Sequence, residues 1–466
     1  MRVFNTLGRE MQTLEPRDRG RISMYVCGAT VQSEPHLGHG RFAVVFDVIR
    51  RHLEWQGYEV TYVRNITDVE DKIIAAAKER GVSTSELVPE MIERWNKAYA
   101  GLGVRPPTVE PRATDHIPEM IELIQKLVDG GLAYPMEGDV YFSVRNFDRY
   151  GRLSGQSLDD LISGARVEAA EHKRDPLDFA LWKAAKPGEP SWESPWGGGR
   201  PGWHIECSAM SLQYLGSDFD IHGGGADLIF PHHENEIAQA EGAGSPFARY
   251  WLHNGLVGLT GEKMSKSTGV LIALSDALRR YPGMGIRLFY LRAHYRSPLE
   301  HSEEMLEDAS SAYRRLWAFR RRVPHPPEGG PDQAVLARFR EAMDDDFNTP
   351  EALGVLFDVV REGNRAVDTG ASATTWAATF DEMVEVLGLQ EPEGGLDDLV
   401  DELAARADRF GLSTSDPRGI VEELLELRER ARADRAFTES DQIRDSLEDL
   451  GIAVEDTPDG VRWHRR

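Results

Sequence analysis

The sequence predicts an α/β fold in which a parallel sheet is followed by a mostly helical C-terminal region and a small terminal α/β piece. Three observations predict this class. A strand–helix–strand pattern occupies residues 22–63, strand-like runs return at 219–222 and 252–259, and helical periodicity dominates after residue 302. Successive strands joined by a helix pair in parallel. At about 150 residues per domain, the 466 residues correspond to about three domains.

The first unit starts with an apolar run at residues 22–27, which is typical of a buried strand and ends at Gly28. An amphipathic helix follows, because apolar residues recur at helical spacing. These residues are Phe42, Val45, Phe46, Ile49 and Leu53. Gly57 ends the helix, and residues 59–63 alternate like the next strand. We expect this unit to open the parallel sheet.

Residues 111–200 differ in texture from the flanking sequence. They combine a helical pattern, a hairpin candidate at 139–144 and a loop-rich part at 186–202 that contains many Trp, Pro and Gly residues. Strand patterns characteristic of the sheet return only afterwards. The pattern therefore predicts an insertion into the sheet domain at about 111–200.

The C-terminal third is helical by pattern, with breaks at 324–331 and 391–395, where Pro and Gly are frequent. A charged helix after about residue 413 precedes Gly451-Ile452-Ala453-Val454, which is typical of a short strand. The chain has no long apolar heptad seam, which favours a monomer.

Composition excludes several classes of protein. The formal net charge is -24, so a generic basic coat for nucleic acid is excluded and any such contact needs a local patch. Only Cys27 and Cys207 are cysteines, which excludes a disulfide scaffold. Met1 to Glu10 contains charged residues and no apolar core, unlike a secretory signal, and no run reaches about 18 apolar residues. We expect a cytoplasmic chain that does not enter a membrane.

The first candidate site is His36-Leu37-Gly38-His39, where the first strand leads into the first long helix. Glycine lets a ligand approach the backbone, and a helix N-terminus attracts phosphate. Two histidines three positions apart can donate hydrogen bonds to negative oxygens. The alternative is that both histidines only cap the helix.

The second candidate site contains Lys263 and Lys266, two of only nine lysines, within Gly261-Glu262-Lys263-Met264-Ser265-Lys266-Ser267. Small polar neighbours indicate a surface loop. Two ammonium groups beside serine hydroxyls suit a polyphosphate whose charge shifts during a reaction. The alternative is an ordinary solvated basic loop. Because the first site also suits a phosphate ligand, we favour the functional interpretation of the two sites together.

The early His-x-Gly-His and the later Lys-Met-Ser-Lys-Ser together resemble the paired motifs of class I aminoacyl-tRNA synthetases. Over nearly the whole chain, the sequence resembles the cysteinyl-tRNA synthetases. The further matching stretches are Arg64-Asn65-Ile66-Thr67-Asp68, Asp178-Phe179-Ala180-Leu181-Trp182-Lys183, residues 199–211 and residues 220–241. Gln32 and Thr268-Gly269-Val270 depart from the usual pattern, and we expect only local changes in loop packing there.

The resemblance implies a division into domains. Residues 1–255 would form the Rossmann-like catalytic domain with its insertion, and residues 256–301 a stem-contact region with the Lys-Met-Ser-Lys-Ser loop. Residues 302–400 would form a helical bundle, in which the run Asp344-Asp345-Asp346-Phe347-Asn348-Thr349-Pro350 resembles the family's anticodon-side bundle. Residues 401–466 would form a small tRNA-binding domain.

The two cysteines gain a role from this resemblance. From spacing alone they are either two small buried residues or distant metal ligands. If Pro231 opens a helix, His232 and Glu236 fall on one face and can share an ion. The resemblance implies one Zn²⁺ per chain, held by Cys27, Cys207, His232 and Glu236. A metal–sulfur bond would distinguish the thiol of cysteine from a hydroxyl, with no editing domain required.

The implied activity is the ligation of L-cysteine to tRNA(Cys) with ATP and Mg²⁺, through a cysteinyl-adenylate. His36, Gly38 and His39 would bind ATP, and Lys263 and Lys266 would stabilise the departing pyrophosphate. The resemblance also implies an amino-acid pocket lined by Thr67, Trp203 and Asp227, with Asp227 a partner of the α-ammonium. Each of the three could instead be structural.

Arginines in the last charged helix could form a phosphate-binding face. They are Arg428, Arg430, Arg432, Arg435 and Arg444. A solvated helix with internal ion pairs is the alternative, and Trp463 could stack on a base or close the terminal fold.

Three other functions compete with tRNA ligation. One is a cysteine ligase that acts on an amino-sugar, which generally lacks the long tail present here. Another is a nucleotidyltransferase, which needs no thiolate-rich metal site. The third is a non-catalytic relative, against which the intact histidine and lysine motifs argue.

Overall fold

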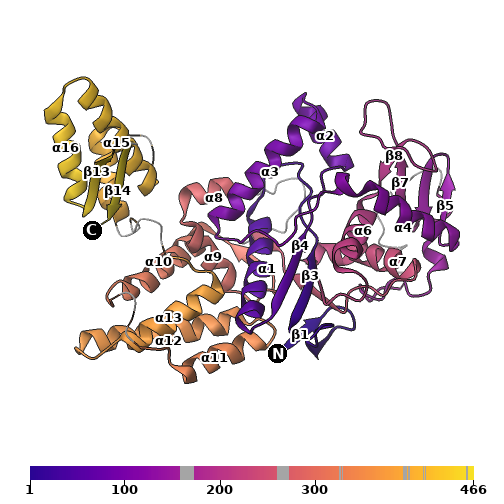
Figure 1. Ribbon diagram of the computed structural model, residues 1–466, viewed down its shortest axis with the longest axis horizontal. Helices are drawn as coiled ribbons and strands as arrows, with labels where there is room; N and C mark the ends of the chain where they lie inside the picture. Colours follow the sequence, from indigo (N-terminus) through magenta and orange to yellow (C-terminus); the bar gives the residue numbers. More distant parts are fainter. Residues whose placement is uncertain are drawn as a thin grey trace.

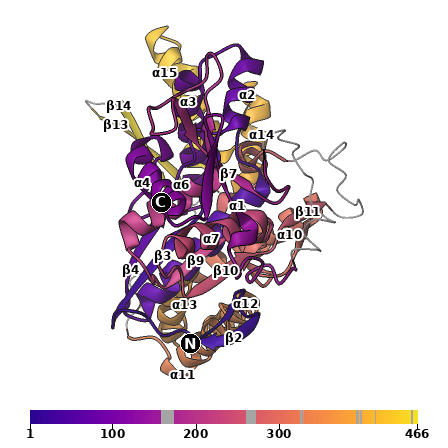
Figure 2. The same cartoon turned by 90° about the vertical axis from the view of Figure 1, so that its right-hand side faces the viewer.

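The computed structural model describes residues 1–157, 173–259, 272–324, 327, 329–391, 396, 399–412, 414, 416–457 and 460–465 (Figure 1). Its central sheet has four parallel strands in the order β10-β9-β3-β4, which can be followed across the centre of Figure 2. They are β3 (Arg21–Val26), β4 (Glu59–Arg64), β9 (Ile221–Gly225) and β10 (Tyr250–Asn254). The predicted α/β class with a parallel sheet is confirmed.

Helix α1 (Leu37–Trp55) connects β3 to β4, as the strand–helix–strand pattern predicts. Every residue of β3 after Arg21 is buried, so the strand has no solvent-exposed face. Gly57 follows the helix with a φ of +90°, a conformation that favours glycine and reverses the chain. Helices α2 (Asp71–Arg80) and α3 (Thr84–Gly101) come after β4.

The N-terminus forms a short antiparallel hairpin of β1 (Arg2–Asn5) and β2 (Glu10–Thr13), which the sequence pattern did not predict. Two strands of four residues are too short for alternation to identify. The hairpin is joined to the central sheet by the backbone hydrogen bond from Thr6 to Trp251.

The insertion contains η1 (Ala113–His116), α4 (Ile117–Asp129), η2 (Val144–Asn146) and an antiparallel sheet in the order β5-β6-β7-β8, on the right of Figure 1. The strands are β5 (Ala133–Met136), β6 (Asp139–Phe142), β7 (Phe179–Ala184) and β8 (Gly199–Pro201). The hairpin candidate at 139–144 supplies only one arm, because the turn lies earlier, at Glu137 and Gly138, both with positive φ. Helix α6 (Trp203–Leu215) returns the chain to β9.

After β9 come η3 (Ala226–Leu228), η4 (Ile229–His233) and α7 (Glu234–Gly242). After β10, strand β11 (Val257–Leu259) pairs in parallel with β12 (Leu299–His301). Between those two strands the described residues include α8 (Leu274–Arg280) and α9 (Gly283–Leu291).

Helices then dominate, as predicted. They are α10 (Glu303–Arg320), α11 (Gln333–Asp344), α12 (Thr349–Asp368), α13 (Thr374–Leu387), α14 (Val400–Phe410), α15 (Pro417–Ala433) and α16 (Phe437–Glu448). The chain ends in a hairpin of β13 (Ile452–Thr457) and β14 (Gly460–Arg465), so the predicted terminal strand is present and has a partner. No described helix is long and apolar enough to cross a membrane.

Three hydrophobic cores organise these elements. One joins the α1 side of the sheet to helices α9–α13, so the bundle shares a core with the helix that starts at the His-x-Gly-His turn. A second lies between the sheet and the insertion and contains both cysteines. A third belongs to the C-terminal helices and hairpin alone, which form a group of their own in Figure 1.

Candidate active site and metal centre

The predicted site residues gather at one edge of the central sheet. Cys27 directly follows β3, Thr67 comes shortly after β4, and Asp227 comes shortly after β9. The carboxyl ends of parallel strands meet at the same edge, which is where α/β proteins bind ligands. His36 caps α1 at that edge, so the topology alone brings four segments of sequence together.

The four residues that were predicted to bind metal lie together. One donor atom from each of Cys27, Cys207, His232 and Glu236 falls within a set whose members are all within 4.8 Å of one another. Cys27 Sγ lies 3.3 Å from Glu236 Oε1, and His232 Nε2 lies 3.1 Å from that same oxygen. All four side chains are buried.

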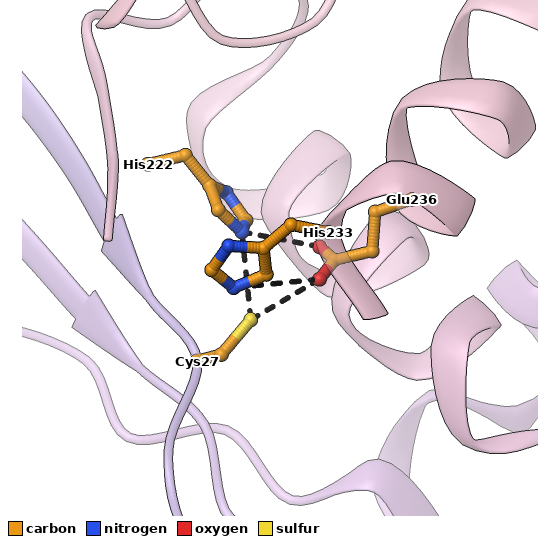
Figure 3. A group of neighbouring side chains, drawn as sticks. All are labelled: Cys27, His222, His233 and Glu236. Carbon is orange, nitrogen blue, oxygen red and sulfur yellow. Dashed lines mark hydrogen bonds and ion pairs between the residues drawn. The ribbon is translucent and has the colours of Figure 1, made fainter. Parts of the chain in front are cut away.

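A second set of four shares Cys27 and Glu236 and adds His222 and His233. Figure 3 shows both imidazoles and the Cys27 sulfur around the Glu236 carboxylate. His222 Nε2 lies 3.4 Å from Cys27 Sγ and 3.2 Å from Glu236 Oε2, whereas His233 Nε2 lies 3.9 Å from Glu236 Oε1. Sequence reasoning missed His222. Its only signal was a place in a strand of the parallel sheet.

The electrostatics of this cluster fit a cation. Burial raises the pKa of Cys27 and of Cys207, and the nearby Glu236 carboxylate raises both further. Burial lowers the pKa of His232 well below its ordinary value. Without a metal, the two thiols and the imidazole around the buried carboxylate are therefore neutral. A divalent cation that binds them would displace the thiol protons. Two sulfurs, one nitrogen and one oxygen form a donor set that suits zinc.

Neighbouring rings fix the orientation of His232. Its Nδ1 is hydrogen-bonded to Nδ1 of His204 at 2.9 Å, which leaves Nε2 directed toward the cluster. The indole of Trp203 stacks on the His232 ring, with centroids 4.2 Å apart and planes 29° apart. Half-buried Trp203 therefore connects the candidate metal ligands to the predicted amino-acid pocket.

His36 and His39 form a reciprocal cap at the start of α1. His36 Nδ1 accepts a hydrogen bond from Gly38 N at 3.1 Å, and His39 Nδ1 accepts one from His36 N at 3.2 Å. Within the described part of the chain, Nε2 of neither ring has a hydrogen-bond partner, so each can donate to a ligand. The alternative of capping and the prediction of ligand binding are therefore compatible, because they use different ring atoms.

Gly38 is required by this packing. A Cβ added there would lie 2.9 Å from Cε1 of His36 and 3.1 Å from its Nδ1, inside normal contact distance. Burial, and to a smaller extent the neighbouring His36, lowers the pKa of His39 to about 3. Burial also lowers the pKa of His36, opposed by the carboxylate of Asp227. Exposed Asp227 thus lies near enough to His36 to raise the pKa of its ring.

Thr67 is buried shortly after the end of β4. Its hydroxyl accepts a hydrogen bond from Asn65 Nδ2 at 3.3 Å, and its backbone N–H donates to Ala29 O. Asn65 Oδ1 in turn accepts from Gly28 N at 2.8 Å, which joins the ends of β3 and β4. Lys263 and Lys266 lie outside the described residues.

Comparison with solved structures supports the fold. A methionyl-tRNA synthetase of Mycobacterium tuberculosis, solved with methionyl-adenylate, matches with a TM-score of 0.56 at 18% identity, over 79% of this chain and 90% of the other. A LeuRS–tRNA–LeuAMS complex from Agrobacterium radiobacter K84 matches with a TM-score of 0.57 at 11% identity, over 81% and 84% of the two chains.

Sequence comparison goes further. The tRNA synthetases class I (C) catalytic domain matches residues 13–311, a DALR domain matches 338–391, and a cysteinyl-tRNA ligase anticodon binding domain matches 417–463. Together with the His-x-Gly-His turn at the edge of a parallel sheet, these matches define a class I aminoacyl-tRNA synthetase.

Full-length relatives identify the family. The cysteine–tRNA ligase of Desulforudis audaxviator is 50% identical, and the alignment covers 100% of both chains. The cysteine–tRNA ligase of Methylobacillus flagellatus is also 50% identical with 100% coverage of both chains. The chain belongs to the cysteine–tRNA ligase family.

Proposed function

We propose that the chain activates L-cysteine with ATP and transfers it to the terminal adenosine of tRNA(Cys), and that a zinc ion recognises the substrate thiol. The observation that carries the proposal is the buried group of two sulfurs, one imidazole and one carboxylate beside the capped start of α1. Cys27, Cys207, His232 and Glu236 would hold the ion, which supplies a Lewis-acidic partner for sulfur.

The selectivity for cysteine follows from the chemistry of this donor set. A site that offers a metal to the substrate binds a thiolate far better than the hydroxyl of serine. Apolar pockets alone separate side chains of similar size by only about 1–3 kcal/mol. His204 and Trp203, which hold the His232 ring, would keep that ligand correctly oriented for the substrate.

In the first step, a carboxylate oxygen of cysteine attacks the α-phosphorus of ATP, and pyrophosphate leaves. His36 and His39 donate from Nε2 to phosphate oxygens, while Asp227 pairs with the α-ammonium. Lys263 and Lys266 balance the charge that develops on the pyrophosphate, which Mg²⁺ also accompanies. Such preorganised donors lower the barrier because they need no rearrangement during the reaction.

In the second step, a ribose hydroxyl of the tRNA's terminal adenosine attacks the carbonyl carbon of the adenylate, and AMP leaves. Thr67 and Trp203 line the pocket in which the aminoacyl group lies. The chain would act as a monomer, with the metal site and the ATP site in one sheet edge of one polypeptide.

A local basic groove supports tRNA as the partner of this acidic chain. A groove of about 910 Å³ runs from Glu34 and Pro35, next to His36, to Asp416 and Pro417 at the start of α15. Its basic lining residues, Arg94, Lys97, Arg279, Arg280 and Arg314, outnumber its acidic ones, Glu34, Asp276 and Asp416. Three of these arginines, Arg94, Arg279 and Arg280, are paired with carboxylates, so an RNA phosphate would exchange with those partners.

The arginine face expected on the last charged helices needs a correction. Arg428 is buried within the C-terminal core, so it does not belong to a surface face. Arg430, Arg432 and Arg435 are exposed, and Arg444 pairs with Asp441 and Asp445. The remaining exposed arginines and the groove are therefore the proposed contacts for RNA.

ATP–pyrophosphate exchange across the amino acids tests the proposal, followed by charging of a tRNA(Cys) transcript and of an amino-sugar acceptor. We expect exchange with cysteine, no measurable exchange with serine, and charging of the tRNA alone. Exchange that depends on a different amino acid, or transfer to the amino-sugar, would contradict it.

A further inference from the structure

The turn between α11 and α12 has an unusual backbone. Asp346 has a φ of +60° and Phe347 a φ of +54°, so two consecutive residues with side chains adopt the left-handed region. Residues other than glycine seldom do so, and such outliers persist only where surrounding contacts determine them. Both side chains are buried, which places the turn inside the molecule rather than on a free surface.

Asp346 is held by two other segments, the N-terminal hairpin and the turn at residues 294–297. Its Oδ1 accepts hydrogen bonds from Phe4 N of β1 at 2.8 Å and from the Tyr295 hydroxyl at 2.9 Å. Its Oδ2 accepts one from Arg296 Nε at 2.6 Å, and its backbone N–H donates to Arg2 O. One carboxylate thus joins the helical bundle to the N-terminal hairpin and to the turn at residues 294–297.

The turn at 294–297 is also the anchor of Arg41 in the first turns of α1. The guanidinium of Arg41 is fully buried and donates to His294 O at 3.1 Å and Ser297 O at 2.6 Å. It also donates to Gly255 O at 2.9 Å and Leu256 O at 3.1 Å, just before β11. Arg41 follows the His-x-Gly-His turn, so the 294–297 turn and the ATP-site helix are fastened to each other.

We infer that Asp346 is a positioning residue for adenylate formation, which acts by fixing the 294–297 turn and through it Arg41 and the start of α1. The proposal rests on the proposed function and goes beyond it, since Asp346 lies in the bundle and is none of the residues proposed to bind ATP, cysteine or metal. Through Arg41, the same turn also fixes the chain that enters β11, after which the sequence reaches Lys263 and Lys266.

The effect is expected on kcat and not on cysteine binding. The candidate metal ligands lie directly after β3 and on α6, η4 and α7. None of them is hydrogen-bonded to Asp346, Arg41 or the 294–297 turn in the described part of the chain. A small displacement of the ATP-site histidines changes the reacting geometry, and misplacement by about 1 Å costs up to about 100-fold in rate.

Asp346→Asn tests the inference. Asparagine has the same shape as aspartate and tolerates positive φ. Its amide nitrogen cannot accept a hydrogen bond, however, so the donors to one of the two carboxylate oxygens, either Arg296 or the pair Phe4 N and Tyr295 hydroxyl, lose their acceptor. In cysteine-dependent pyrophosphate exchange we expect kcat to fall about 10- to 100-fold while KM for cysteine is unchanged. Asp345→Asn is the matched control, since exposed Asp345 carries the same charge next door; we expect its kcat within about two-fold of wild type.

A double-mutant cycle tests the connection through the turn. In Arg41→Lys a single ammonium group replaces the planar guanidinium, which donates hydrogen bonds to carbonyls of residues 255–256 and of residues 294–297. If Asp346 acts through Arg41, the loss in the double variant is smaller than the product of the single losses. If the loss of kcat in the double variant equals the product of the two single losses, Asp346 does not act through Arg41 and the inference is overturned. Where Asp346→Asn fails to fold by circular dichroism, Tyr295→Phe, which removes one donor to Oδ1, replaces it in the same comparison.

Two failures are distinguishable. A wild-type chain without cysteine-dependent exchange contradicts the proposed function itself. The second failure is a wild-type chain that exchanges normally while Asp346→Asn has the same kcat as Asp345→Asn. Asp346 would then contribute to stability alone, even if its variant has a lower melting temperature, and the positioning role would be overturned.

Discussion

The imidazoles of His36 and His39 stack with their centroids 3.6 Å apart and their planes 28° apart, at the first turn of α1. Each ring uses Nδ1 to satisfy a backbone N–H of that turn. The helix N-terminus therefore determines which nitrogen carries the proton, because an Nδ1 that accepts must leave the hydrogen on Nε2. Two neutral rings that each carry an N–H donor at Nε2 have the hydrogen-bonding groups that phosphate oxygens would need.

Gly38→Ala is expected to disrupt this pair. A Cβ at position 38 would lie 2.9 Å from the His36 ring, so the ring must move and its cap is weakened. We expect the kcat of pyrophosphate exchange to fall about 10-fold or more. Gly354→Ala is a matched control at an exposed position of helix α12, where no atom lies within 4 Å of the added Cβ. It should stabilise the chain by about 0.5–1 kcal/mol and leave exchange unchanged. Equal exchange rates in both variants would contradict the assigned role of Gly38.

The depressed pKa of His39 predicts a pH-dependent stability. In the folded chain this pKa is lowered from 6.5 to about 3, so between these values the unfolded chain binds a proton that the folded chain does not. The contribution of neutral His39 is therefore complete above about pH 6.5 and is lost as the pH falls toward about 3. In His39→Asn the slope of unfolding free energy against pH should be shallower by up to about 1.36 kcal/mol per pH unit in this window. Urea unfolding of both proteins across the window measures it, and identical slopes would refute the burial of a neutral His39.

Much of the fold was predictable because its signals are local. The pattern at 22–63 predicted β3, α1 and β4, since a buried strand, an amphipathic helix and a returning strand each have their own period. The insertion's hairpin was placed too late in the chain, because the β-prone run Val140-Tyr141-Phe142 of β6 is visible in sequence, whereas β5 is interrupted by Pro135.

The candidate site was predicted less evenly. His232 and Glu236 do lie together, although α7 begins only at Glu234 and His232 belongs to the preceding η4 turn. His222 was missed because its place depends on register, in which Tyr25 of β3 faces His222 of β9, and no local pattern contains that information. Arg428 was misjudged although spacing held a clue, since it follows buried Leu424 and Leu425 by four and three positions on one helical face.

Lys266→Ala is predicted to slow adenylate formation without unfolding the chain. The ammonium group would balance charge on the departing pyrophosphate, so its loss should lower kcat of exchange about 100-fold or more, in line with the loss of other transition-state donors. Lys126→Ala removes an equal charge from an exposed ion pair with Glu122 and should leave exchange unchanged. Normal exchange in Lys266→Ala would exclude the proposed role in the first step.

Cys207→Ser and His222→Asn together distinguish the two overlapping sets of metal ligands. Both side chains are buried and both lie near Glu236, but Cys207 belongs only to the first set and His222 only to the second. Loss of a neighbour that merely orients a ligand costs about 10- to 100-fold in metal affinity, so loss of a ligand should cost more. If the first set holds the zinc, Cys207→Ser loses stoichiometric metal and KM for cysteine rises with it, whereas His222→Asn keeps its metal. Zinc content by mass spectrometry and competition with a chelator measure both variants against wild type. The reverse pattern would assign the metal to Cys27, His222, His233 and Glu236, and a wild-type chain that binds no zinc in either assay would remove the metal from the mechanism.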